Sequence, residues 1–434
     1  MRAVVLVVAV GCARPATAPT APAANDEPET ADVRGTTGVP GMERVPAAMG
    51  AGTPAALPHD AVRHYTIWLG GARIGAARES ERWTASGVEL RRVETMRFRR
   101  GDAVIDLATT IDIDASRALV PERVRWTELA GEARSAEAVH DVHGWHGAHL
   151  ASDAVPAELV PLLVRRDGKF AGDVFMAARG FVGGAARVET VAPGRMVARM
   201  EVGDATAAEA TIDIGADGMP ERVVDGEGVI ELRASEATAM APFAPVDLIA
   251  ATAIPIAGRR RRALVLDGEL ALPPLPGQRA VPTASGLVVE LSAALPGDLP
   301  PGEPGPDRTR EIAAIVGRVR ARITPSLASA PAGSRDARAV AGDCTTFALA
   351  YAALASARGI PTRVVTGFRV DRDRLVRHRW AISWTGARWI AVDAAFAAAP
   401  AGGDLVGLAV HDADDAGLVS GEAALSSVHA AAWQ

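Results

Sequence analysis

Residues 342–365 read GDCTTFALAYAALASARGIPTRVV, and this stretch decides how the C-terminal part of the chain folds. Its apolar side chains follow the i, i+3, i+4, i+7 spacing of a helix with one buried face: Phe347, Ala350, Tyr351 and Leu354. Asp343 is a favourable N-cap residue, and Gly359 followed by Pro361 ends the helix. The pattern therefore predicts a buried helix that carries Cys344 in its first turn.

The position of Cys344 has chemical consequences. The partial positive charge and the unpaired N–H groups at a helix start favour a thiolate, and the N–H groups can also hold a developing oxyanion. An ionised Asp343 beside the thiol would oppose the thiolate. We therefore treat Cys344 as a candidate nucleophile whose reactivity depends on a neighbouring base.

A histidine and an aspartate downstream supply the candidate base and the residue that orients it. Residues 375–384 and 387–392 read as two strands joined by a two-residue turn at Thr385-Gly386, and that register places His378 opposite Asp393. A carboxylate there accepts the imidazole N–H and fixes its tautomer. Each residue alone would suit an ordinary structural role, but together they predict a Cys344, His378, Asp393 triad.

Two tryptophans and the N-cap residue are the candidates for the substrate pocket. Trp380 shares a strand face with His378, and Trp389 lies on the partner strand. We expect both to wall the site and limit water. Asp343 completes this set because it adjoins the thiol.

The following segments together resemble a transglutaminase-like core of the papain-related thiol superfamily, from Asp307 onward: Gly342-Asp343-Cys344, the Ala-rich helix, residues 359–367, His378-Arg379-Trp380, Gly386, Trp389 and Asp393. The resemblance implies an α+β fold with the nucleophile helix on an antiparallel sheet, and no metal or cofactor. It also implies that Cys344 is the nucleophile, His378 the base and Asp393 the orienter. Two positions depart from the family pattern: Arg379 replaces a usual alanine, and Ala394-Ala395 replace a proline and a small polar residue.

The reaction implied is attack of Cys344 on an amide or peptide carbonyl through a thioester. Water as acceptor gives a cysteine peptidase or amidase, which we favour slightly, and an amine gives an acyltransferase. The partner expected is therefore a protein or peptide substrate. The alternative is a catalytically silent binding or scaffold lipoprotein, in which the upstream β-rich region does the work.

The N-terminus has the pattern of a targeting signal. Residues 1–12 form a lipoprotein-type signal peptide ending at Cys12, and residues 13–60 form an Ala/Pro/Thr-rich flexible tether. We expect an extracytoplasmic protein in the cell envelope, lipid-anchored at the outer membrane or periplasmic face. A plain secretory signal and a Cys12–Cys344 disulfide are the alternatives. If Cys12 is lipidated, Cys344 is the one remaining thiol, because the chain has 2 cysteines.

A chain of 434 residues predicts more than one domain. Period-2 alternation predicts an antiparallel β-rich module over residues 61–245, with one helix at 156–166, followed by a β linker region over 246–305. Residues 306–434 form the transglutaminase-like core, so the expected fold is multidomain α+β. The net charge of −6 argues against a nucleic-acid partner.

Overall fold

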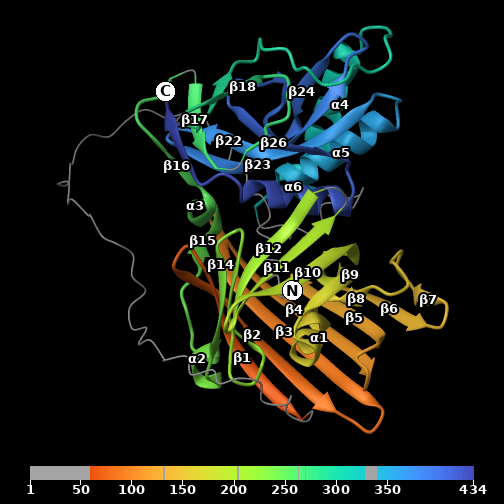
Figure 1. The fold of residues 1–434 in the computed structure, drawn as a ribbon. Coiled ribbons are helices and arrows are strands. Elements are labelled where there is room, and N and C mark those ends of the chain that lie inside the picture. The colour runs from red at the N-terminus through yellow and green to blue at the C-terminus, as the bar shows by residue number, and fades with distance from the viewer. Residues whose placement is uncertain are drawn as a thin grey trace.

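The computed structural model describes residues 59–130, 132–202, 205–261, 263–268, 270–284, 286–327 and 340–434. The predicted signal peptide, Cys12 and all but the last two residues of the predicted tether lie outside the described residues. The described chain is rich in strands, and these form two large sheets that lie one above the other (Figure 1).

The first sheet is antiparallel along most of its length. Its strands are β1 (Ala61–Leu69), β2 (Ala72–Trp83), β3 (Gly87–Arg100), β4 (Ala103–Ser116), β5 (Pro121–Ala130), β6 (Glu132–Asp141), β7 (Gly144–His146), β8 (Val155–Pro156), β9 (Phe170–Met176), β10 (Val182–Ala192), β11 (Arg195–Val202), β12 (Ala205–Ile214), β13 (Pro220–Asp225), β14 (Val229–Ala234) and β15 (Val246–Asp247). The spatial order runs from β7 back to β1, then from β14 back to β8, so β1 pairs with β14 at the middle of the sheet.

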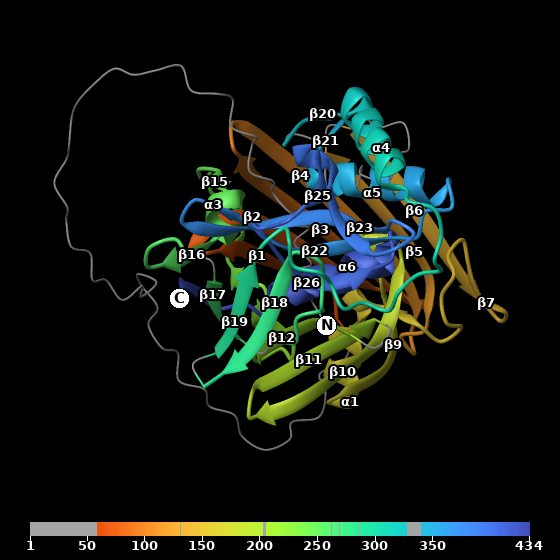
Figure 2. The same ribbon diagram turned by 90° about the horizontal axis from the view of Figure 1, so that it is seen from above.

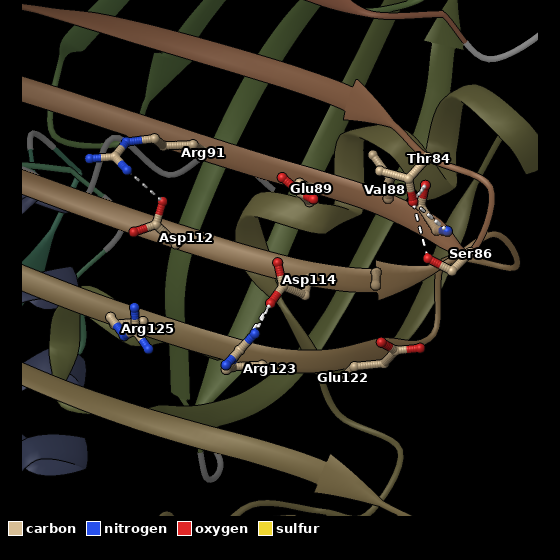
Figure 3. Close-up of a pocket in the computed structure, with 12 residues that line it drawn as sticks. Thr84, Ser86, Val88, Glu89, Arg91, Asp112, Asp114, Glu122, Arg123 and Arg125 are labelled. Atoms are coloured by element: carbon tan, nitrogen blue, oxygen red, sulfur yellow. Dashed lines mark hydrogen bonds and ion pairs between the residues drawn. The ribbon is translucent and has the colours of Figure 1, made fainter.

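The two faces of the first sheet differ, as period-2 alternation predicts. Along β3 every second side chain is buried over most of the strand. Many outward side chains of β3, β4 and β5 are charged and pair across strands, for example Arg91 with Asp112 at 3.3 Å and Arg123 with Asp114 at 2.7 Å (Figure 3). The predicted helix is confirmed as η1 (Ala157–Leu159) followed by α1 (Val160–Asp167).

The second sheet collects strands from both ends of the remaining chain. Its strands are β16 (Ile254–Ala257), β17 (Ala263–Asp267), β18 (Gln278–Thr283), β19 (Gly286–Leu291), β22 (Thr362–Asp371), β23 (Arg374–Trp384), β24 (Trp389–Asp393), β25 (Ala398–Ala401), β26 (Leu405–His411) and β27 (Ala430–Trp433). Strand β27 lies between β16 and β17, so the C-terminal strand pairs with the segment that we expected to be a linker. The mark for the C-terminal end lies beside β16 and β17 in Figure 2. The predicted linker segment therefore contributes strands to the second sheet.

Three helices pack on the second sheet: α4 (Thr309–Arg322), α5 (Cys344–Ser356) and α6 (Asp415–Leu425). The helix predicted to carry Cys344 in its first turn is confirmed as α5. Helices α4 and α5 lie side by side in both views and share a core with β22 and β23 (Figures 1 and 2). Helix α6 contacts β22 and β26 above it and β12 of the first sheet below it.

The predicted register of the β23–β24 hairpin is wrong by two residues. Trp384 pairs with Trp389, and the connection is a four-residue loop over 385–388. Thr385 closes this loop, because its N–H donates to the Arg388 carbonyl and its hydroxyl accepts from the Arg388 N–H. The loop also docks on the chain before α4, where the Gly305 N–H donates to the Gly386 carbonyl at 3.0 Å. These contacts hold a longer turn than the Thr-Gly pair alone suggested.

Of the helices in the described part of the chain, none is both long enough and apolar enough to span a membrane.

Candidate active site

His378 and Asp393 form a buried hydrogen-bonded pair. The His378 Nε2 atom lies 2.8 Å from Asp393 Oδ2, and both side chains are almost fully buried. The pair forms because a register shift of two residues preserves strand faces, so His378 and Asp393 still project from the same face of the sheet. Asp393 is also fixed from its other oxygen, since Oδ1 accepts the Phe396 N–H at 3.3 Å and caps η4 (Ala394–Phe396).

Aromatic rings surround the imidazole of His378. Trp380 stacks on it with ring centroids 5.8 Å apart, and Phe396 meets it edge-on at 5.5 Å. Trp389 lies farther along the hairpin, where it contacts Trp384 at 5.7 Å and donates to the Pro300 carbonyl at 2.9 Å. Of the two predicted pocket tryptophans, the structure therefore places Trp380 directly against His378 and Trp389 toward the segment that contains Pro300.

Arg369 is a site residue that the sequence did not single out. Its Nη1 lies 3.4 Å from the same Asp393 oxygen that His378 contacts, and its Nη2 lies 2.8 Å from Asp404 Oδ2. Its guanidinium also covers the Phe396 ring at 3.4 Å from the centroid. The pairing of β22 with β23 sets Gly367 opposite His378, so Arg369 projects from the same face two residues on. That strand pairing was the signal needed to find it.

Cys344 lies where the sequence predicts, in the first turn of α5. Asp343 is the N-cap, as predicted: its Oδ1 accepts the N–H groups of Thr345 at 3.0 Å and Thr346 at 3.3 Å. Those two N–H groups are therefore committed to the cap and are not available to an oxyanion, which corrects part of our expectation for this turn. The Asp343 Oδ2 accepts a hydrogen bond from Arg100 Nη2 of β3 at 2.6 Å.

Helix α5 and the His378–Asp393 pair meet at η4. Cys344 is buried, and it shares a core cluster with Ala394 and Ala395, the two residues that follow Asp393. Helix α4 supports the same turn, since Arg320 donates to the Ala395 carbonyl. The structure thus brings His378 and Asp393 into contact and places Cys344 in the core that borders the turn after Asp393.

Arg379, the departure from the family pattern, faces away from the imidazole. Successive residues of a strand alternate faces, so Arg379 projects toward α5 and α6 while His378 projects to the other side. Arg379 is buried and donates to the hydroxyls of Thr345 at 3.0 Å and Thr366 at 2.9 Å. Burial lowers its pKa, and the carboxylate of Glu422 at 3.6 Å acts in the opposite direction. The Arg379 side chain thus links β23 to the first turn of α5 through a buried hydrogen bond.

The oxidation state of the Cys344 sulfur decides whether it can react. The chain's other cysteine is Cys12, which lies outside the described residues. A disulfide sulfur is not a nucleophile, so any reaction at Cys344 requires its reduced thiol.

A family model described as the transglutaminase-like superfamily matches residues 302–394. The matched segment runs from the chain before α4 to the first residue of η4, and it contains Cys344, His378 and Asp393. No curated protein and no solved structure showed a significant match to the chain. The chain therefore carries a transglutaminase-like domain over these residues.

Proposed function

We propose that the chain is a thiol enzyme that acts on an amide or peptide carbonyl through a Cys344 thioester. The observation that carries the proposal is the buried His378–Asp393 hydrogen bond, which adjoins η4, the turn that packs against the helix beginning at Cys344. A buried carboxylate that holds one imidazole nitrogen leaves the ring oriented for proton transfer at the other. The transglutaminase-like match over the same residues supports this assignment.

The steps follow from the residue roles. The Cys344 thiolate forms a bond to the carbonyl carbon, and the carbonyl electron pair moves to oxygen. The tetrahedral adduct collapses, the carbon–nitrogen bond breaks, and His378 gives its proton to the leaving amine. His378 then removes a proton from water, which attacks the thioester and releases the acid and the thiol. An amine in place of water would give acyl transfer; we favour hydrolysis.

Trapping the acyl intermediate tests this proposal. The reduced full chain is incubated with a peptide library that offers both backbone and glutamine side-chain amides, quenched in acid, and analysed by intact mass and peptide mapping. We expect an acyl adduct on Cys344 that hydroxylamine removes. Absence of any adduct on Cys344 in the reduced protein, with Cys344 shown to be alkylatable, would count against the enzyme assignment.

One observation favours a second candidate, a catalytically silent binding or scaffold protein. Arg379 follows His378, and Ala394-Ala395 follow Asp393, where the family pattern has other residues. The two candidates differ in the fate of the reduced protein. An enzyme acquires the acyl group after reduction, whereas a silent scaffold stays unmodified under both conditions.

We also propose that the protein is extracytoplasmic and lipid-anchored through Cys12. Because Cys12 is the only other cysteine, lipidation of Cys12 and an intrachain disulfide at Cys344 exclude each other. Cell fractionation of Cys12→Ser distinguishes them. Lipidation predicts loss of membrane association and a larger, uncleaved chain, whereas unchanged fractionation and size would contradict the anchor.

A further inference from the structure

The first sheet contacts the candidate active site through two ion pairs, one buried and one part-buried, that adjoin the candidate catalytic residues. Arg100, the last residue of β3, bonds Asp343, which precedes Cys344. Glu227, between β13 and β14, bonds Arg377 at 2.8 Å, and Arg377 precedes His378. The first sheet, to which the sequence assigned no role, thus contacts the chain next to both Cys344 and His378.

The Arg100–Asp343 pair is the most buried of these contacts. The two side chains are 1% and 3% exposed, and the Arg100 Nη2 to Asp343 Oδ2 distance is 2.6 Å. Arg100 ranks among the largest fully buried side chains of the described residues. A buried charge is costly unless a partner compensates it, so the carboxylate and the guanidinium each depend on the other.

Asp343 has two conflicting effects on its neighbour. Its Oδ1 caps α5 and so fixes the turn that carries Cys344. Its negative charge, buried one residue from the sulfur, disfavours a second negative charge on the thiolate. Arg100 resolves the conflict, because it neutralises Asp343 through Oδ2 while Oδ1 keeps its cap.

We propose that Arg100 is a positioning residue for Cys344: supplied by the first sheet, it neutralises the capping carboxylate so that the thiol ionises near neutral pH. This inference rests on the proposed function, since it assigns the first sheet a part in the same site. Under this proposal the β-rich region affects the ionisation of the thiol, in addition to any part it has in binding a substrate or in holding the domain away from its anchor.

Other charged groups lie on the elements packed around this turn. They are His378 and Arg379 on β23, Asp393 at the end of β24, Arg369 on β22, Arg320 on α4 and Glu422 on α6. None of these is altered in the variants below, so their contribution is the same in every protein compared.

The test is the rate of iodoacetamide alkylation of the reduced full chain against pH, with Cys344 followed by peptide mapping. Arg100→Met removes the neutralising charge and should raise the pH midpoint by about one unit or more. Asp343→Asn keeps a capping oxygen but loses the charge, so its midpoint should fall below that of the wild type. The double variant should lose the rise seen in Arg100→Met alone.

Arg97→Met is the matched control, because Arg97 lies on the same strand in an exposed ion pair with Asp106. It should leave the midpoint unchanged. Circular dichroism establishes that each variant is folded, and the Asp343→Asn result decides the question if Arg100→Met does not fold. A midpoint that is the same in Asp343→Asn and the wild type, or a rise in Arg100→Met that persists in the double variant, would overturn the proposal.

The two proposals fail in different ways. If wild-type Cys344 alkylates like an ordinary thiol and His378→Ala changes nothing, the enzyme assignment fails, whatever the Arg100 variants do. If the wild-type midpoint is low but the charge variants do not move it as stated, only the role of Arg100 fails.

Discussion

Arg369 and His378 share one oxygen atom, Asp393 Oδ2, at 3.4 and 2.8 Å. The carboxylate therefore lies between a permanent cation and an imidazole that would become cationic in the proposed reaction. Because its other oxygen caps η4, Asp393 links β23, which carries His378, to the turn that contacts α5. The three contacts make Asp393 the residue on which the orientation of the site depends.

Replacing Asp393 by Asn should lower the rate of acyl-adduct formation on the order of 10²–10⁴-fold, because an amide neither fixes the same tautomer nor stabilises the imidazolium. Asp404→Asn is the control, since Asp404 also pairs with Arg369 but is not bonded to His378. Its rate should stay within a few-fold of wild type. Equal rates in Asp393→Asn and wild type would show that the pair is structural.

Arg369→Met should slow adduct formation by about tenfold, less than Asp393→Asn, because the His378–Asp393 bond survives without it. Arg369→Lys keeps the charge but lacks the planar stacking on Phe396. Its rate of adduct formation should lie between those of Arg369→Met and the wild type. Adduct formation by intact mass over time measures both. An Arg369→Met rate equal to wild type would remove Arg369 from the site.

Tyr351→Phe should cost about 0.5–1.5 kcal/mol of unfolding free energy, the usual loss for one buried hydrogen bond. The Tyr351 hydroxyl lies 2.8 Å from Ser383 Oγ, which is in turn 2.8 Å from Thr362 Oγ1. Burial raises the pKa of Tyr351 to about 12, so the phenol stays protonated through neutral pH. Urea unfolding of the two proteins provides the measurement, and equal midpoints and slopes would contradict it.

Stability should fall as pH rises from about 4 to about 7 through Asp225. Burial, with the nearby charge of Glu227, raises the pKa of Asp225 to about 7 from an ordinary 3.8. Between these values the unfolded chain releases a proton that the folded chain keeps, so unfolding becomes easier with rising pH. Partial exposure of the side chain makes the slope shallower than about 1.4 kcal/mol per pKa unit.

Asp225→Asn isolates this effect, because its side-chain oxygen can still accept the Glu227 and Val229 N–H groups, both 2.9 Å from Asp225 Oδ1. The variant should show a flatter dependence of unfolding free energy on pH over this window. Urea titrations at pH 4, 5.5 and 7 compare the slopes. The same slope in both proteins would mean that Asp225 titrates normally.

Local patterns were enough to predict much of the C-terminal half. The apolar spacing and N-cap located α5, and period-2 alternation located the strands that carry His378 and Asp393. The hairpin register was wrong by two, yet the His378–Asp393 contact formed because a shift of two keeps each residue on its face. A shift of one would have separated the pair.

Contacts between distant segments could not be predicted in the same way. Arg100 and Asp343 are 243 positions apart, and nothing in either local pattern pairs them. A β linker region was predicted over 246–305, but the place of its strand β17 beside β27 depends on how the chain's last strand pairs. The position of Arg369 likewise requires the pairing of β22 with β23, which the turn between them does not specify.

The central claim is that His378 activates Cys344, and the most direct test is the alkylation rate of reduced Cys344 against pH in the wild type and in His378→Ala. A pH midpoint well below the ~8.5 of an ordinary thiol, lost in His378→Ala, is the result that we predict. A midpoint near that of an ordinary thiol in both proteins, with equal rates, would contradict the claim.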